Sequence, residues 1–266
     1  MWKEPGNKEP YIELEDMNDD EKNIVEEKKI EGKAMKFSNL ENFKKKAICK
    51  IEYGGFHGTG FFWKIPNPLN DNKNTLNVLL TCYHVLPLEK KGLKINLFDY
   101  YIDNKKKTLN LNGKNRLIRS CEGLDYTCIE ILKDDNIDEY FDVDENLINS
   151  NPKEYLKEVS IFSCGYLQQE LYFDFKNIKK IGNRSILHNC NTEEGWSGGP
   201  IFNSINQRVI AIHKNYHKDH KYNTGLLIKS VINDLKRKDN KDIDSSDEFD
   251  DKDEFGDNNV KEKKKN

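Results

Sequence analysis

The sequence contains no apolar run of about 20 residues, the length that a membrane-spanning helix requires. Residues 1–6 (MWKEPG) do not provide the hydrophobic core of a signal peptide. We therefore expect no membrane contact and a cytoplasmic location. The net charge of −3 also gives no overall basic character, so we expect no nucleic-acid partner.

The sequence also lacks any C-x-x-C pair, the spacing typical of zinc sites, so we expect no metal and no other cofactor. Without an export signal we expect a reducing compartment, where disulfides are rare. The six cysteines are therefore expected to be free thiols. They are Cys49, Cys82, Cys121, Cys128, Cys164 and Cys190.

Hydrophobic residues make up 36% and charged residues 33% of the 266 residues, a balance that fits a folded core with highly charged flanks. Residues 1–43 form a charged N-terminal arm. Within it, residues 38–41 (SNLE) have the spacing of a capping box, which predicts a short helix through Lys46. Residues 236–266 form a charged tail rich in Asp and Glu, which we expect to be disordered.

The core, residues 44–235, carries many short apolar or alternating runs separated by turn residues, without long helical patterns between them. This pattern is typical of β-barrels. We expect barrel one at about residues 44–135 and barrel two at about residues 156–235, joined by a polar connection. Residues 230–236 are expected to form a short C-terminal helix.

The segment at residues 195–200 (GWSGGP) places one serine, Ser197, among glycines. A nucleophilic serine needs a tight, uncrowded turn, and backbone N–H groups must face the developing oxyanion; residues without a Cβ permit this geometry. The hydroxyl also needs a base within hydrogen-bond reach. His84, which ends a hydrophobic run, is the candidate base, and Ser197 is the candidate nucleophile.

A third group must orient the imidazole and stabilise its protonated form. Asp125 is our candidate, because it opens the alternating apolar run at residues 126–131. Asp99 and Asp103 are rivals, but neither opens such a strand.

At these residues the chain resembles the trypsin-like serine peptidases of the chymotrypsin fold, in the bacterial-type branch of glutamyl endopeptidases and HtrA-like proteases. The resemblance rests on residues 57–62 (HGTGFF), 192–202 (TEEGWSGGPIF) and 209–213 (VIAIH), together with the His84 segment, and it covers about residues 44–235. It implies an all-β fold of two antiparallel six-stranded β-barrels, with the active site in the cleft between them.

The resemblance also implies an activity. The chain would be a serine endopeptidase that hydrolyses protein or peptide substrates through a Ser-His-Asp triad and an acyl-enzyme. The backbone N–H groups of Gly195 and Ser197 would form the oxyanion hole. Trp196 departs from the digestive enzymes, which carry an aspartate there that pairs with a newly cut N-terminus. Activation by that ion pair is therefore expected to be absent.

A specificity pocket is implied as well. Asn191 stands where trypsin has its aspartate, so no carboxylate is available to receive Lys or Arg. Thr192 and His213 match the positions with which glutamyl endopeptidases hold a substrate carboxylate, and Lys214 lies beside them. Hydrogen-bond donors that converge on one anion favour Glu or Asp before the cleaved bond.

The sequence leaves some alternatives open. Glu193 and Glu194 would oppose an acidic preference unless they point to solvent. His217 and His220 have a spacing that could hold a metal ion, although an exposed loop is the simpler interpretation. A catalytically silent trypsin-like module that binds peptides, or a nonenzymatic interaction protein working through its charged ends, would also fit. The sequence indicates no oligomeric state.

Overall fold

The computed structural model describes residues 35–36, 43–68, 74–88, 96–112, 116–217 and 222–237. The expected helix start at Ser38, the charged tail from residue 238 onward, and His220 lie outside the described residues. The described end of the expected N-terminal helix is a 3-10 helix at Lys45–Ala47. No helix in the described ranges combines the length and apolar character needed to cross a membrane.

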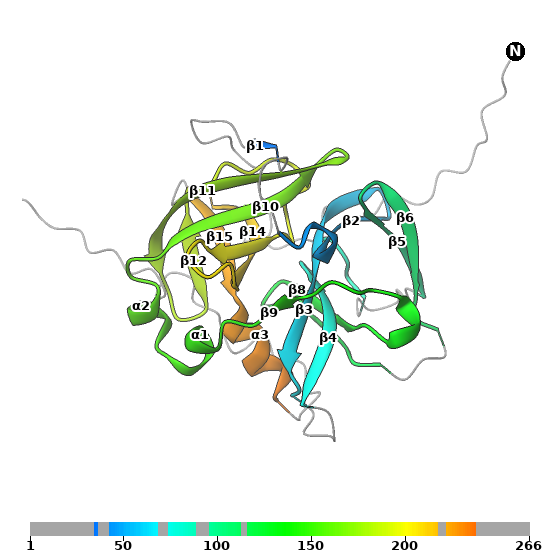
Figure 1. The fold of residues 1–266 in the computed structure, drawn as a ribbon, viewed down its shortest axis with the longest axis horizontal. Coiled ribbons are helices and arrows are strands. Elements are labelled where there is room, and N and C mark those ends of the chain that lie inside the picture. The colour runs from blue at the N-terminus through cyan, green and yellow to red at the C-terminus, as the bar shows by residue number, and fades with distance from the viewer. Residues whose placement is uncertain are drawn as a thin grey trace, which may run out of the picture.

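The second half of the chain forms a closed barrel of six antiparallel strands (Figure 1). Their order is β11-β10-β13-β14-β15-β12, and β12 pairs back with β11 to close the barrel. A short strand, β1 (Met35–Lys36), pairs with the other end of β11. The six strands are β10 Ser160–Leu167, β11 Glu170–Ile181, β12 Ser185–His188, β13 Pro200–Asn203, β14 Val209–His217 and β15 Tyr222–Leu227.

The first half forms a sheet of seven antiparallel strands in the order β6-β5-β2-β3-β4-β8-β7. A two-residue strand, β9 (Phe141–Asp142), pairs in parallel with β3. The predicted two-barrel, all-β fold class is confirmed, and the first sheet has one antiparallel strand more than expected. The seven strands are β2 Ile48–Tyr53, β3 Phe56–Pro66, β4 Thr75–Thr81, β5 Leu97–Ile102, β6 Lys105–Asn110, β7 Ile118–Cys121 and β8 Tyr126–Glu130.

Strand β3 is the centre of the first sheet. It pairs with β2 on one side and β4 on the other, and Phe61, Phe62 and Trp63 are all fully buried. A strand that is covered on both faces is expected to show such a continuous apolar run instead of alternation. The N-terminal part of the same strand carries Thr59, which reaches the second barrel.

Four phenylalanine rings join the two barrels. The Phe43 ring lies 5.4 Å from the Phe141 ring and 5.3 Å from the Phe202 ring, and Phe162 stacks on Phe202 at 4.7 Å between centroids. Phe141 belongs to β9, whereas Phe162 and Phe202 belong to β10 and β13. This aromatic contact holds the barrels side by side and so positions the residues between them.

Two short helices lie in the connection between the barrels, α1 (Glu145–Asn149) and α2 (Pro152–Tyr155). The helix at the C-terminal end of the second barrel, α3 (Ile228–Leu235), confirms the predicted C-terminal helix and begins two residues earlier than expected. Its buried Asp234 accepts hydrogen bonds from Arg119 Nε at 3.0 Å and from the Tyr126 hydroxyl. Helix α3 therefore returns to β7 and β8 of the first sheet.

Candidate active site

His84 and Asp125 are brought together at the ends of two neighbouring strands. His84 follows β4, and Asp125 directly precedes β8 in a left-handed turn conformation with a φ of 57°. Both carboxylate oxygens of Asp125 lie 3.0 Å from His84 Nδ1, and Oδ1 also accepts the His84 backbone N–H at 3.1 Å. Asp125 thus binds both the imidazole and the backbone N–H of His84.

The charge of Asp125 is set by two opposing effects. Burial on its own would raise the pKa of the carboxyl. The adjacent His84, followed by Lys214, outweighs burial and brings the pKa below its ordinary value. Asp125 is therefore ionised near neutral pH, the state that stabilises a protonated imidazole.

The two rival aspartates lie elsewhere. Asp99, on β5, binds Lys106 Nζ at 2.7 Å and accepts the Thr108 hydroxyl at 2.7 Å. Asp103 occupies the exposed turn between β5 and β6. In the described part of the chain, Asp125 is therefore the candidate that contacts His84.

Ser197 lies in the second of two consecutive tight turns. The Trp196 N–H donates to the Glu193 carbonyl at 3.0 Å, and the Gly199 N–H donates to the Trp196 carbonyl at 2.8 Å. Gly195 and Gly198 occupy the third positions of these turns with φ values of 99° and 86°, as type II turns require. A Cβ on Gly198 would lie only 2.2 Å from the Thr59 carbonyl oxygen, so both conformation and space demand glycine there.

The two turns leave two backbone donors unused. Within the described ranges, neither the Gly195 N–H nor the Ser197 N–H donates a hydrogen bond to the protein. The Ser197 backbone also lies close to the His84 turn, because a Cβ on the adjacent Gly198 would be 3.0 Å from the Cys82 nitrogen. An anion next to Ser197 could accept hydrogen bonds from both N–H groups.

The Ser197 hydroxyl itself donates to the Lys214 carbonyl oxygen at 2.7 Å. In the described residues it makes no hydrogen bond to His84. A rotation about the side chain's first torsion is needed to bring the hydroxyl to the imidazole. Catalytic hydrogen bonds often form only when substrate is bound.

Trp196, between Gly195 and Ser197, is fully buried. Its ring packs directly over Gly165 of β10, where an added Cβ would be 2.3 Å from the indole Cγ. Packing against β10 therefore holds Trp196 at the position where the digestive enzymes form an ion pair.

Three of the four residues of the expected specificity pocket are buried. Thr192 and His213 are fully buried, and the Thr192 hydroxyl has no hydrogen-bond partner in the described part of the chain. Asn191 is also buried, but its side-chain and backbone N–H groups both donate to Asp174, at 3.1 and 2.7 Å. Asp174 therefore fixes the start of the loop that presents Thr192.

Lys214 and the two glutamates differ from this buried group. Lys214 lies in an irregular stretch of β14, where the pairing register with β15 shifts between His213 and Tyr216. Its charge acts on Asp125. The Glu194 side chain is 88% exposed and lies 3.9 Å from His57, so it points to solvent as an anion site would need, whereas Glu193 is half-buried.

His188 contacts His213, although the sequence alone suggested no role for it. Its Nε2 lies 3.4 Å from His213 Nδ1, and its Nδ1 accepts the Cys190 N–H at 3.3 Å. Burial, together with His213, holds the pKa of His188 well below its ordinary value. A neutral His188 whose Nδ1 accepts the Cys190 N–H carries its proton on Nε2 and donates it to His213 Nδ1.

The sequence feature that could have indicated His188 is its place at the end of the run Ser185–His188, just before the segment with Asn191 and Thr192. Its contact with His213 depends on the pairing of β12 and β14 with β15 and could not be read from the local sequence.

One group in the described ranges could offer three metal-ligating atoms, those of Cys82, His84 and Asp125, which lie within 4.8 Å of one another. All three already have protein partners: His84 binds Asp125, and the Cys82 thiol donates to the His213 carbonyl at 3.3 Å.

The six cysteines are free and buried, as predicted.

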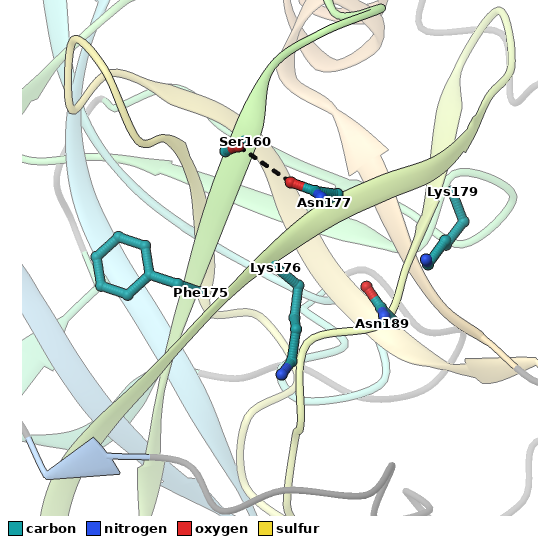
Figure 2. A pocket seen from close by; sticks show the side chains of 6 residues that line it. All are labelled: Ser160, Phe175, Lys176, Asn177, Lys179 and Asn189. Carbon is teal, nitrogen blue, oxygen red and sulfur yellow. Dashed lines mark hydrogen bonds between the residues drawn. The ribbon is translucent and has the colours of Figure 1, made fainter.

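A separate hollow lies on the second barrel, where β10, β11 and the loop after β12 meet (Figure 2). Lys176, Lys179 and Asn189 line it, and Ser160 donates to Asn177 at 3.0 Å on its wall. None of the expected site residues lines this hollow.

The fold that carries this arrangement is found in solved serine proteases. A Glu endopeptidase in complex with MPD is 14% identical with a TM-score of 0.55, and the match covers 76% of this chain and 94% of that one. The serine protease domain of the Sesbania mosaic virus polyprotein is 16% identical with a TM-score of 0.51, over 77% and 98% of the two chains. A serine endoprotease from Yersinia pestis is 14% identical with a TM-score of 0.50, over 73% and 64%.

These similarities confirm the predicted resemblance at the level of the fold, which is that of the chymotrypsin-like serine proteases. Identities this low establish the fold alone. The sequence matches no protein-family model and no curated protein.

Proposed function

We propose that this protein is a serine endopeptidase in which Ser197 is the nucleophile, His84 the general base and Asp125 the group that orients the base. The observation that carries the proposal is the contact of Asp125 with His84 Nδ1 at 3.0 Å, beside a serine turn with two unused N–H groups. This arrangement has the parts that acyl transfer requires.

The proposed reaction begins when the Ser197 hydroxyl turns from the Lys214 carbonyl to His84. His84 Nε2 takes the proton as Oγ attacks the peptide carbonyl, and the N–H groups of Gly195 and Ser197 bind the oxyanion. His84 then protonates the leaving amine, which gives an acyl-enzyme. Water, deprotonated by His84, attacks the acyl group, and the serine leaves with the proton.

Labelling with a fluorophosphonate probe tests the activity. The wild-type protein should be labelled, and Ser197→Ala should lose both labelling and peptide hydrolysis while it stays folded. Ser204→Ala, in the turn after β13, is the matched control and should be labelled like the wild type. Hydrolysis that persists in Ser197→Ala would refute the proposal.

One observation favours a second candidate, a catalytically silent peptide-binding module: the Ser197 hydroxyl rests on Lys214 and not on His84. Such a module would bind peptides without labelling or turnover. The same probe experiment therefore separates the two candidates.

We further propose that the enzyme prefers Glu or Asp before the cleaved bond. Support comes from the buried Thr192 hydroxyl, which has no hydrogen-bond partner in the described ranges, and from the contact between His188 and His213. One solved protein of this fold is a Glu endopeptidase. Protein or peptide substrates and a cytoplasmic location belong to the same proposal, and the six free thiols support a reducing compartment.

Matched peptides with Glu or Gln before the cleaved bond test this preference. Loss of a hydrogen-bonded charge from a buried site costs about 2–5 kcal/mol, so Glu should be preferred by roughly tenfold or more. His213→Ala should reduce cleavage after Glu more than cleavage after Gln. A preference for Lys, Arg or large apolar residues would refute the pocket assignment and leave the proposed triad intact.

A further inference from the structure

Thr59, on β3 of the first sheet, connects three separate parts of the molecule. Its backbone N–H donates to the Ser197 carbonyl at 2.8 Å, and its hydroxyl donates to the Gly195 carbonyl at 2.7 Å. The same hydroxyl accepts the Tyr166 N–H of β10 at 2.9 Å. Thr59 is fully buried, so water does not compete for these bonds.

The two carbonyls bound by Thr59 lie on either side of the peptide that carries the Ser197 N–H. Anchoring both carbonyls restricts rotation between Gly195 and Ser197, and therefore fixes the direction of that N–H. The loop needs such an anchor, because Gly195 and Gly198 both adopt left-handed conformations and glycine has few steric barriers of its own. Gly195 also packs against β10, where an added Cβ would be 2.6 Å from the Tyr166 carbonyl oxygen.

A hydroxyl suits this position because it can donate and accept at once. Here it donates to Gly195 and accepts from Tyr166, and so joins the serine loop to β10. The Thr59 carbonyl is held in turn by the Thr81 hydroxyl at 2.7 Å, at the end of β4, just before His84. The strand that leads to His84 is thereby linked to the loop that carries Ser197.

We propose that the Thr59 hydroxyl is a positioning group for the oxyanion site: it aligns the Gly195–Ser197 loop for the transition state without touching the substrate. The proposal rests on the proposed peptidase function.

Three variants test it: Thr59→Val, Thr59→Ser and Ile65→Ala. Valine keeps the shape and the backbone N–H but removes the hydroxyl, whereas serine keeps the hydroxyl. Ile65 is a buried residue further along β3, away from the loop, so Ile65→Ala controls for lost stability on the same strand. Each kcat is normalised to the number of sites that a fluorophosphonate titrates, at a temperature where all the proteins are folded.

Loss of a whole oxyanion donor costs about 10²–10³ in turnover, so misalignment should cost about 10–100-fold. Thr59→Val should therefore lose kcat by this factor with a nearly unchanged KM. Thr59→Ser should retain most of the turnover, and Ile65→Ala should lose thermal stability without losing kcat.

A wild-type kcat in Thr59→Val would overturn the proposal, and so would a Thr59→Ser variant as impaired as Thr59→Val. A wild-type protein that neither labels nor cleaves would instead refute the peptidase function on which the proposal depends. The two failures are thus distinguishable.

Discussion

At the scale of single residues, the contact between Asp125 and His84 determines which imidazole nitrogen carries the proton. A carboxylate at Nδ1 keeps the proton there and leaves Nε2 able to accept from serine. Asp125→Asn is expected to favour the wrong tautomer and to lower kcat by about 10⁴-fold. The measurement is kcat for a peptide substrate near neutral pH.

The matched control for this substitution is Asp99→Asn. Asp99 is bound by Lys106 and Thr108 at the surface of β5, so its amide variant should keep the wild-type kcat. Near-normal turnover in Asp125→Asn, or an equal loss in Asp99→Asn, would contradict the role given to Asp125.

The buried His188 predicts a pH dependence of stability. Its pKa is well below the ordinary value in the folded protein, whereas the unfolded chain titrates near about 6.5. Below about pH 6.5 the unfolded chain binds a proton at His188 that the folded protein does not bind. The contribution of the neutral His188 to the free energy of unfolding is therefore complete above about pH 6.5 and is lost as the pH falls. The expected slope is about 1.4 kcal/mol per pH unit.

Urea unfolding at several values between pH 6.5 and 5 measures this slope. His188→Gln cannot take up the proton, so its free energy of unfolding should fall less steeply with pH by about this amount. Equal slopes in the two proteins would show that His188 is not held neutral by burial.

Local sequence was enough to nominate His84, Asp125 and Ser197, because each lies next to a strand end or a glycine turn. The sequence was not enough for Thr59 and His188. Their roles depend on contacts with Gly195 and His213, residues distant in sequence that only the folding of the barrels brings close. The resting direction of the Ser197 hydroxyl is likewise a property of the folded loop.

At the scale of elements, the Gly195–Ser197 loop depends on the contact between Trp196 and β10. An added Cβ on Gly165 would lie 2.3 Å from the indole Cγ and 2.8 Å from the Trp196 Cα. Gly165→Ala is therefore expected to displace the loop and to destabilise the protein by about 1–3 kcal/mol, as overpacking does. Turnover per folded molecule should fall as well, because Trp196 lies between Gly195 and Ser197, whose N–H groups are the proposed oxyanion donors.

Urea unfolding and active-site titration measure these two effects. The double variant Gly165→Ala/Trp196→Leu gives the matched test, since a smaller side chain leaves room for the added methyl group. It should be more stable than the sum of the two single variants predicts. If the changes in the free energy of unfolding of the two single variants simply add in the double variant, the added methyl group does not clash with the Trp196 ring.

The elements also differ in how well their sequences reveal them. Strands with continuous apolar runs, such as β3 and β4, and the helix α3 were predictable. Strand β6 carries three lysines and owes its structure to pairing with β5, so its own pattern is weak. Helices α1 and α2 have only five and four residues, too few to show helical periodicity.

At the scale of the whole molecule, α3 links the C-terminal end of the second barrel to the first sheet. Asp234 is buried and binds Arg119 and Tyr126, which belong to β7 and β8. The aromatic contact of Phe141 with Phe202 joins the barrels at a second place, 4.8 Å between ring centroids. The proposed active site lies on elements from both barrels, so its geometry depends on these connections.

Two truncations test where the structural part of the chain ends. Removal of residues 240–266 should leave stability and peptide cleavage unchanged, because α3 and its buried Asp234 and Leu235 are kept. Removal of residues 234–266 takes away Asp234 and leaves the Arg119 charge without its partner. Breaking a buried ion pair costs about 3–5 kcal/mol, and the lower end is expected here because Arg119 is 20% exposed.

Both truncated proteins are compared by urea unfolding and by kcat per titrated site. The comparison separates the contribution of residues 234–239 from that of residues 240–266. The protein that lacks residues 234–266 should be less stable than the full chain. Its kcat should fall only if the two barrels shift against each other. A loss in the shorter truncation would mean that the acidic tail takes part in folding or regulation. Full stability in the deeper one would mean that the aromatic contact alone holds the barrels, and that α3 is not an anchor.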